Sequence, residues 1–368
     1  MIDFRYHLVS LISVFLALAV GIALGAGPLK ETIGDTLTGQ VSQLREEKDA
    51  AQLALGENER YLDEVAGSLV GDALAERRLG FVLLDDVPDG TLADLEDTFA
   101  EAGAQVVSRV SVTDRWTAED DQVFRSALAA RLVEYLEPAV DMSASVDEIL
   151  AAALVQAIAG KDPAAPLTLS ANAEILAGLL ASEGGGLVDG DLPADGPVDA
   201  LVVIAPTLEE RPEGAEPPTE EEQRAIDGAL RAHAAIALAA QQRSEGAILV
   251  VDEYTEGDLV SFVRSSDDLA ERISTVTRYT TMSGRLSTVL GLGSRIALRV
   301  GHYGFDPGAD MAAAPRTELP PVDRTPVVVP PDDDGSEDDP DDGAEDGDDG
   351  DQDVPDPEDD TTDDGGTG

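Results

Sequence analysis

The first hydrophobic pattern along the chain is an unbroken apolar run near the N-terminus. Residues 8–26 read LVSLISVFLALAVGIALGA and carry no charged side chain. A helix of these 19 residues is roughly 28 Å long at ~1.5 Å per residue, close to the ~30 Å hydrocarbon thickness of a bilayer. The sequence therefore predicts a membrane-targeting segment within residues 1–30.

Three interpretations of this run remain open at the level of sequence. We favour a retained anchor, because the run is longer than the apolar region of a signal peptide and Asp3 offsets Arg5 before it. A cleaved signal peptide and a buried helix of a soluble protein are the alternatives. Because long following domains translocate largely regardless of their charge, we expect the N-terminus in the cytoplasm and the C-terminal domain outside it.

Residues 31–78 follow a second pattern, in which apolar side chains recur every three or four residues. With Val41 at position a of a heptad, seven of nine a and d positions are apolar. The a positions are Val41, Lys48, Leu55, Leu62 and Leu69, and the d positions are Leu44, Ala51, Asn58 and Val65. This spacing predicts a parallel coiled coil that makes the protein a homo-oligomer. A single amphipathic helix lying on the next domain is the alternative.

From residue 79 the pattern changes to short apolar runs that alternate with helical periodicity. Strands are predicted over 79–84, 105–112, 199–205, 246–251 and 274–277, and helices over 92–102, 120–135, 146–159, 171–182, 219–243 and 284–293. The helix after Thr219 opens with a capping box that Glu222 completes. Strand, helix and strand in succession form a βαβ unit, so residues 79–315 predict a Rossmann-like α/β domain with four or five parallel strands.

The last segment, residues 316–368, has no periodicity and is predicted to be a disordered acidic tail. Between residues 332 and 364 it holds 20 Asp or Glu and no Lys or Arg. The whole chain has 75 acidic and 24 basic residues, a formal net charge of −51, which argues against nucleic acid as a partner. Without cysteine, the chain has no disulfides, thiolate metal sites or cysteine nucleophiles.

Candidate chemistry is sparse in this sequence. The first strand-to-helix turn, residues 85–90, holds three carboxylates and one glycine, so it would repel a phosphate. Glycine-rich runs at 184–186 and 291–293 follow predicted helices and do not open them. There is no G-x-S-x-G nucleophile motif. We therefore predict no catalytic residue and no cofactor-binding residue, and the chain is not expected to be an enzyme.

Metal ligands are equally scarce, and the metal-binding residues stay unknown. After the initiator, methionine occurs only at Met142, Met282 and Met311. His233 is expected to be a packed or half-exposed helix residue, and His302 to lie in a glycine-flanked turn after the sheet. His302 is the one histidine for which a functional test is warranted.

Both ends of the ordered sequence resemble a known family. Residues 1–10 (MIDFRYHLVS) continue into 14–25 (VFLALAVGIALG), and 284–290 (GRLSTVL) precede 300–304 (VGHYG). These segments resemble the actinobacterial copper transport protein B family, the MctB-like envelope proteins. The resemblance implies a membrane-anchored protein of the cell envelope, in the plasma membrane or outer membrane, with a role in copper homeostasis. It also implies copper as the transported ion, and it supplies no copper ligands to carry over.

Three functions remain to be distinguished. The first is copper homeostasis, as some members of the resembling family are described as channel-forming proteins that limit intracellular copper. The second is a non-catalytic scaffold, in which a membrane-anchored coiled coil presents an α/β binding domain. The third is a degenerate α/β enzyme, which the missing phosphate and nucleophile motifs disfavour.

Overall fold

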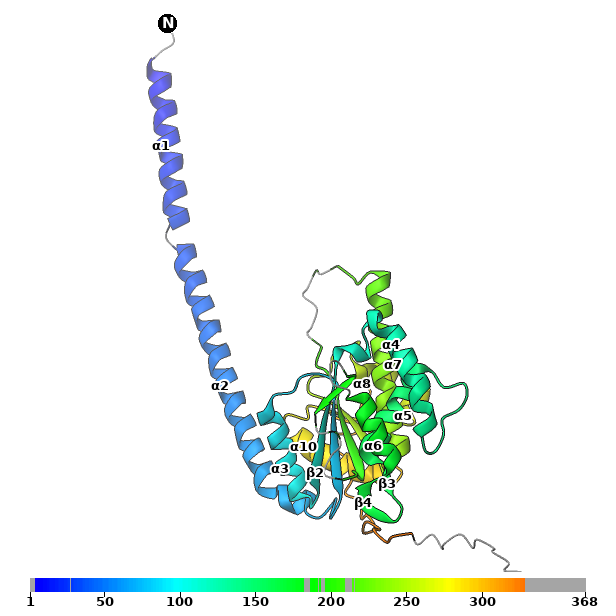
Figure 1. Ribbon diagram of the computed structural model, residues 1–368. Helices are drawn as coiled ribbons and strands as arrows, with labels where there is room; N and C mark the ends of the chain where they lie inside the picture. The colour runs from blue at the N-terminus through cyan, green and yellow to red at the C-terminus, as the bar shows by residue number, and fades with distance from the viewer. Residues whose placement is uncertain are drawn as a thin grey trace, which may run out of the picture. The chain divides into compact units, whose positions relative to one another are not determined.

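The computed structural model describes residues 4–26, 28–181, 186–190, 192, 196–208, 214 and 216–327. For residues 24–26 and 28–38 it describes the backbone and not the side chains. The helices are α1 (Phe4–Ala26), α2 (Pro28–Val70), α3 (Asp89–Glu101), α4 (Gln122–Leu132), α5 (Val146–Ala159), α6 (Ala171–Leu180), α7 (Glu220–Arg243), α8 (Leu259–Ser265), α9 (Asp267–Ala270) and α10 (Met282–Ile296). Short 3₁₀ turns occupy Asp114–Trp116, Glu119–Asp121 and Val133–Tyr135. Figure 1 shows the helices that enclose the sheet.

A seven-stranded, mostly parallel sheet forms the centre of the domain. The strands are β1 (Arg78–Leu83), β2 (Gln105–Val112), β3 (Lys161–Asp162), β4 (Ala165–Leu169), β5 (Val188–Gly190), β6 (Ala200–Ile204), β7 (Ala247–Val251), β8 (Ser274–Thr277) and β9 (His302–Tyr303). In the main sheet their order is β5-β2-β1-β6-β7-β8-β9, and β5 alone runs antiparallel to its neighbour. The strands β3 and β4 form a separate hairpin.

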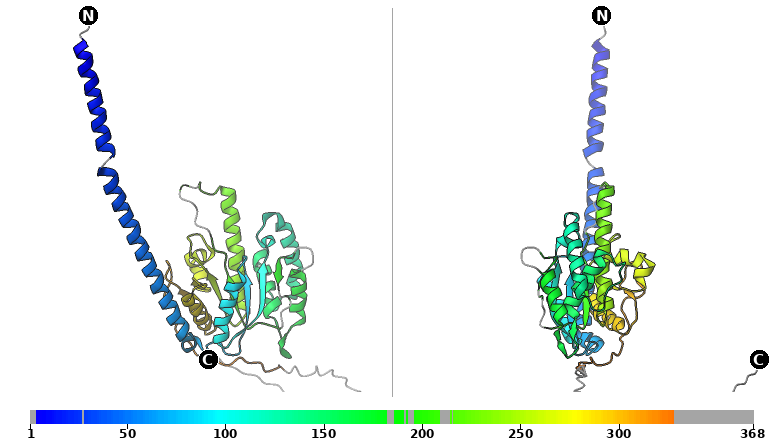
Figure 2. Two further views of the ribbon diagram at one scale, coloured as in Figure 1. Left: turned by 90° about the vertical axis from the view of Figure 1, so that its left-hand side faces the viewer. Right: turned by 45° about the vertical axis from the view of Figure 1, so that its right-hand side comes forward.

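Both faces of this sheet are covered, which explains why its strands read as continuous apolar runs. In β1, the side chains of Leu79 and Phe81 point into one core, while Val82 points into the other. Helices α4 to α8 cover the face of Val82, and α3, α10 and the end of α2 cover the opposite face. The two views of Figure 2 show these layers on either side of the strands.

The mixed α/β architecture predicted from the sequence is confirmed, with additions at the edges. Strand β5 and the β3–β4 hairpin were not predicted, because each is too short or too exposed to give a hydrophobic pattern. The prediction of a turn at His302 is wrong, since His302 and Tyr303 form β9, which pairs with β8.

Helix α10 (Met282–Ile296) extends beyond the predicted range 284–293 at both ends, and Gly291 lies inside it. A Cβ atom on Gly291 would lie 2.6 Å from Cδ1 of Ile248 and 3.1 Å from the ring of Tyr303. The glycine therefore lets α10 approach β7 and β9 closely. Of the other predicted glycine run, Gly184 and Gly185 lie outside the described residues.

The end of α2 belongs to the core of the domain. Ala66, Val70 and Leu74 are fully buried, and Leu62 packs beside them against the layer formed by α3 and α10. Further towards the N-terminus, Leu44 and Leu55 of the predicted seam are exposed. The interpretation of an amphipathic helix lying on the domain therefore holds for the last turns of α2. A coiled coil through the turns of α2 that precede Leu62 stays a prediction.

Residues beyond the predicted end of the domain are bonded to it. The Arg316 guanidinium donates to the carbonyl oxygens of Leu69 and Gly71, at 3.2 and 2.5 Å, where it caps the C-terminus of α2. The backbone N–H of Val327 donates to the carbonyl of Pro163 at 2.8 Å. The predicted tail from residue 328 onward lies outside the described residues, so its disorder stays a prediction.

A buried carboxylate fixes this segment at the amino-terminal edge of the sheet. The side chain of Asp199 is fully buried and accepts hydrogen bonds from Nζ of Lys161 and from Arg324, both at 2.7 Å. The backbone N–H of Arg78, the first residue of β1, donates to it at 2.8 Å. Burial by itself raises the pKa of Asp199, but the bonds from Arg324, Lys161 and Arg78 outweigh it and lower the pKa.

We predict that Asp199→Asn lowers the free energy of unfolding by about 2–3 kcal/mol at pH 7, because two cations lose their partner. Since the native pKa is lowered, the stabilisation is present above the unfolded pKa of about 3.9 and disappears as the pH falls through the native pKa. Urea unfolding followed by the fluorescence of buried Trp116 measures both effects. Asp189→Asn, at an exposed position of β5, is the matched control. An equal loss in both variants would contradict the prediction.

Candidate functional site

Helix α1 is the first functional element, because it is long and apolar enough to cross a membrane. Phe4–Ala23 has a mean hydropathy of 2.1, and none of this stretch is buried by the rest of the described chain. The interpretation of a buried helix of a soluble protein is therefore wrong. Length and composition fit both a retained anchor and a signal segment.

The carboxyl ends of β1 and β6 form the second candidate. The chain leaves β1 towards β2 on one side, while β6, β7 and β8 extend the sheet on the other. Neighbouring crossovers therefore diverge between β1 and β6. In open α/β sheets, ligands bind in the crevice at such a switch point.

A cavity of about 220 Å³ occupies this position. Its lining comes from the loops after β1, β6, β7 and β8 and from the first turn of α3: Asp85, Asp86, Val87, Pro88, Thr91, Ala205, Pro206, Thr207, Asp252, Tyr279 and Thr280. We refer to these residues as the switch-point crevice.

The turn from β8 into α10 places Tyr279 and Thr280 in the crevice. Arg278 has φ of 60°, a left-handed conformation that is uncommon outside glycine. A Cβ atom on Gly284 would lie 1.8 Å from the carbonyl oxygen of Arg278, so only glycine fits there. The Thr281 hydroxyl accepts from the N–H of Gly284 at 3.1 Å and caps α10.

Carboxylates dominate the electrostatics of the crevice. Asp85 accepts a hydrogen bond from the N–H of Asp86 at 2.8 Å, and Asp252 accepts one from the hydroxyl of Thr280. Lys, Arg and His are absent from the described lining. The predicted repulsion of phosphate by the turn after β1 is thus reinforced by Asp252, which the sequence pattern did not single out.

Tyr279 is the most buried polar residue of the crevice. Its side chain is 4% exposed, and its hydroxyl forms no hydrogen bond with the residues that the structure describes. Burial, together with the charge of Asp252, raises the pKa of the phenol to about 12, so the hydroxyl stays protonated at neutral pH.

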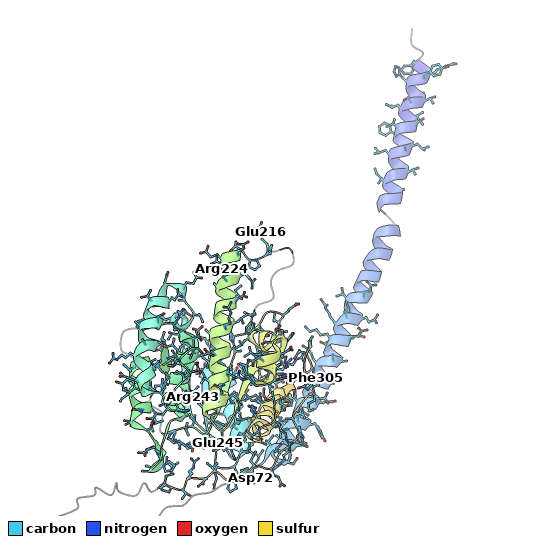
Figure 3. The ribbon with its side chains drawn as sticks, turned by 90° about the vertical axis from the view of Figure 1, so that its right-hand side faces the viewer. Asp72, Glu216, Arg224, Arg243, Glu245 and Phe305 are labelled. Carbon is cyan, nitrogen blue, oxygen red and sulfur yellow. The ribbon has the colours of Figure 1, made fainter. Side chains whose placement is uncertain are left out.

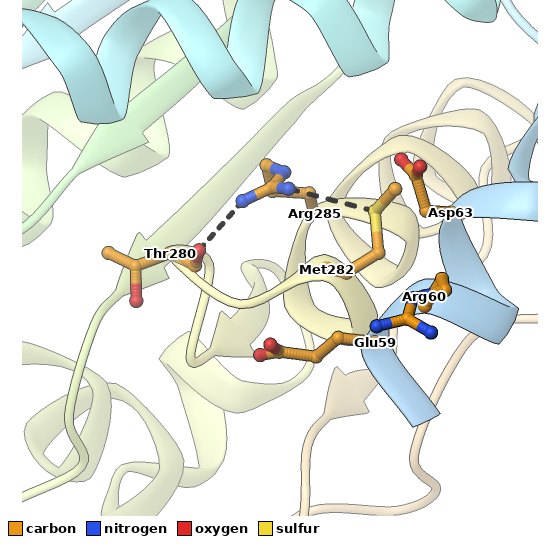
Figure 4. A pocket seen from close by; sticks show the side chains of 6 residues that line it. All are labelled: Glu59, Arg60, Asp63, Thr280, Met282 and Arg285. Carbon is orange, nitrogen blue, oxygen red and sulfur yellow. Dashed lines mark hydrogen bonds between the residues drawn. The ribbon is translucent and has the colours of Figure 1, made fainter. Parts of the chain in front are cut away.

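A second, more open cavity of about 400 Å³ lies where α2 meets the start of α10 (Figure 4). It is lined by Glu59, Arg60, Asp63, Thr280, Met282 and Arg285. Arg285 donates to the carbonyl of Thr280 at 2.7 Å and contacts the Met282 sulfur at 3.7 Å. Its shared residue, Thr280, makes this cavity a neighbour of the switch-point crevice.

The described residues do not assemble a copper-binding cluster. No group of three or more His, Asp or Glu side chains among them could hold one metal ion. Met142 and Met311 are exposed, and Met282 is a lone thioether in its cavity. Copper(I) prefers several sulfur ligands, so these methionines do not form such a site.

The two domain histidines have structural surroundings. His302 is buried, and its Nδ1 lies 2.9 Å from the hydroxyl of Thr275. The backbone N–H of His302 donates to the carboxylate of Asp310 at 2.8 Å. His233 is half-buried on α7, as predicted, and faces the charge of Asp85. Figure 3 shows the course of α7 from Arg224, near the carboxyl edge, to Arg243 and the nearby Glu245 at the amino edge.

Comparisons with known proteins cover most of the chain. The sequence model of a family described as "Copper transport outer membrane protein, MctB" matches residues 1–314. The chain belongs to the MctB family. Relatives named Copper transporter MctB from Mycobacterium bovis and Mycobacterium tuberculosis are 28% identical over 324 residues, 84% of this chain and 98% of theirs. The one from Mycobacterium leprae is 24% identical over 340 residues, 86% of this chain and 100% of its own.

Sequence reasoning did not single out Tyr279, although the signal that places it in the crevice was present. The strand ending at Thr277 was predicted, and residues that follow a parallel strand lie at its carboxyl edge. An aromatic hydroxyl two residues past that strand is thus a candidate for the crevice of this MctB protein. Asp252, directly after β7, could be found in the same way.

We predict that the imidazole of His233 stays neutral down to pH about 4, because burial lowers its pKa more than the charge of Asp85 raises it. The unfolded chain takes up the proton near pH 6.5, so stability is full above that pH and falls as the pH drops towards 4. NMR titration of the imidazole measures the pKa, and His233→Gln should flatten the pH dependence of unfolding. A measured pKa near 6.5 for the imidazole of His233 in the folded protein would contradict this prediction.

Proposed function

We propose that this protein is a membrane-anchored member of the cell envelope that takes part in copper homeostasis and limits intracellular copper. The membership of the MctB family supports this proposal, and the exposed apolar helix α1 is its structural counterpart. Copper is the cargo in this proposal, and the chain itself is not an enzyme.

The proposal places the N-terminus in the cytoplasm and the α/β domain outside it. A helix like α1 inserts through its apolar length, and a long domain after a first span translocates largely regardless of its charge. The high negative charge of this chain therefore does not oppose export. Such a domain would meet copper before the ion reaches the cytoplasm.

We expect deletion of the gene to raise cellular copper and lower copper tolerance, measured by elemental analysis and by growth on copper. The full-length gene should restore both. The double variant Leu11→Arg with Leu16→Arg should not, because each arginine at the centre of a span costs about 2.5–3.5 kcal/mol.

The matched control is Leu53→Arg, which puts the same charge on an exposed leucine of α2, outside the apolar run. This variant should complement as well as the parent gene does. If the deletion strain keeps normal copper content and tolerance, the copper role must be abandoned.

The structure also favours a second candidate, a scaffold in which copies of the protein associate through α2. Val41, Leu44 and Leu55 share one face of the helix by their heptad spacing, and all three are exposed. Anchored N-termini make neighbouring copies parallel, as this pairing requires. Contact between copies is then confined to the turns of α2 that precede Leu62, because the turns from Leu62 onward pack on the domain.

Single cysteines test this association, since the chain has none of its own. With mild oxidation of native membranes, Leu44→Cys and Leu55→Cys should form disulfide-linked dimers. Leu53→Cys should form few, because two residues rotate the side chain by about 200° around the helix. Ala66→Cys, buried against the domain, should also remain unlinked.

Equal cross-linking at Leu53 and Leu55 would indicate random collision and remove the proposed seam. A monomeric result at every position would remove the oligomer altogether. Neither result bears on the copper phenotype, so the two candidate functions are tested separately.

A further inference from the structure

The switch-point crevice combines three observations that independently indicate a ligand. The sheet topology places the crevice where α/β proteins bind their ligands. A cavity of about 220 Å³ is present there. Finally, the Tyr279 side chain lines it, 4% exposed and without a hydrogen-bond partner among the described residues. The ring is therefore enclosed by the protein while the hydroxyl has its hydrogen-bonding capacity left over for a molecule in the cavity.

The chemistry of the lining defines what this partner is. Asp85, Asp86 and Asp252 supply acceptors, and Thr207 with Tyr279 supplies hydroxyls that both donate and accept. The described lining holds no basic side chain to neutralise the carboxylates. A ligand that carries positive charge and several N–H groups fits, and an anion is repelled.

The volume of the cavity and the spacing of its carboxylates further restrict the class of ligand. Pockets for drug-sized ligands have volumes of roughly 300–1,000 Å³, so this crevice holds a smaller molecule. The three carboxylates do not converge on a point where they could coordinate one metal ion. The charge of the ligand must therefore be spread over separate groups.

We propose that the switch-point crevice binds a small organic cation with more than one amine group, held by the three carboxylates and by the Tyr279 hydroxyl. This inference goes beyond the copper role and does not depend on it. One ammonium group contacts the carboxylates near the end of β1. Another lies between Asp252 and the phenol oxygen, which accepts its hydrogen bond.

Isothermal titration of the full-length protein in detergent micelles, without copper and at physiological ionic strength, tests the proposal with 1,4-diaminobutane as the probe. We expect saturable binding of the diamine and none of 1,4-butanediol, which has the same length and no charge. Tyr279→Phe removes only the hydroxyl and should weaken binding about tenfold, as expected for a hydrogen bond to a charged group. Asp252→Asn should weaken it at least as much.

Asp268→Asn is the matched control, because this exposed carboxylate lies on α9, before β8 begins, and should leave the affinity unchanged. Unfolding followed by Trp116 fluorescence verifies that each variant is folded. Absence of saturable binding to the folded parent protein would overturn the proposal. Binding that Tyr279→Phe leaves unchanged would also overturn it, since that result assigns the diamine to other carboxylates, such as those of the C-terminal segment.

Discussion

The last turns of α2 are part of the core of the domain, and this burial is the interaction that joins the helix to the sheet layers. Val70, the last residue of α2, and Leu74, in the turn after it, are fully buried against the layer of α3 and α10, and burying one such side chain stabilises a fold by about 1.5–3 kcal/mol. Arg316 adds hydrogen bonds to the final carbonyls of the helix. The C-terminal end of α2 is therefore joined to the domain by packing and by hydrogen bonds.

Carboxylates at the amino edge of the sheet are paired with basic side chains, whereas the described lining at the carboxyl edge contains carboxylates and no basic side chain. At the amino edge, Lys161 and Arg324 neutralise the buried carboxylate of Asp199, and Arg77 pairs with Glu245 at 3.2 Å. At the carboxyl edge, Asp85 and the other carboxylates of the crevice face no basic side chain of the described lining. Burying a charge is tolerated only when it is paired, and at the amino edge the buried carboxylate of Asp199 has two basic partners. The carboxyl edge keeps its charges near water, where a ligand can meet them.

The sequence predicted the interior of the fold well and its margins poorly. The strands β2 and β8 and the helix α5 match their predicted ranges. Each is long enough for its run of β-branched residues or its helical periodicity to be recognised in the sequence. Strand β9 has two residues and therefore no period, and α10 extends beyond the predicted range 284–293 at both ends.

The candidate crevice was harder to predict for a different reason. Its residues come from four separate loops, and each loop alone resembles an ordinary polar turn. Only the strand order brings Asp85 and Tyr279 to one cavity, and that order follows from tertiary packing. A sequence can therefore locate the carboxyl ends of strands, while the pairing of those ends needs the structure.

Heptad spacing on α2 carries the same ambiguity, and the structure settles it only for the last turns of the helix. Leu44 and Leu62 occupy one face of the helix, yet the first is exposed and the second packs on the domain. Two parallel helices paired along the whole face would require the partner helix to fill the space that α10 already occupies. The predicted a and d positions from Val41 to Asn58 are exposed, so they are the part of this face that the domain leaves uncovered. A polar residue at that d position fits a seam that stops there.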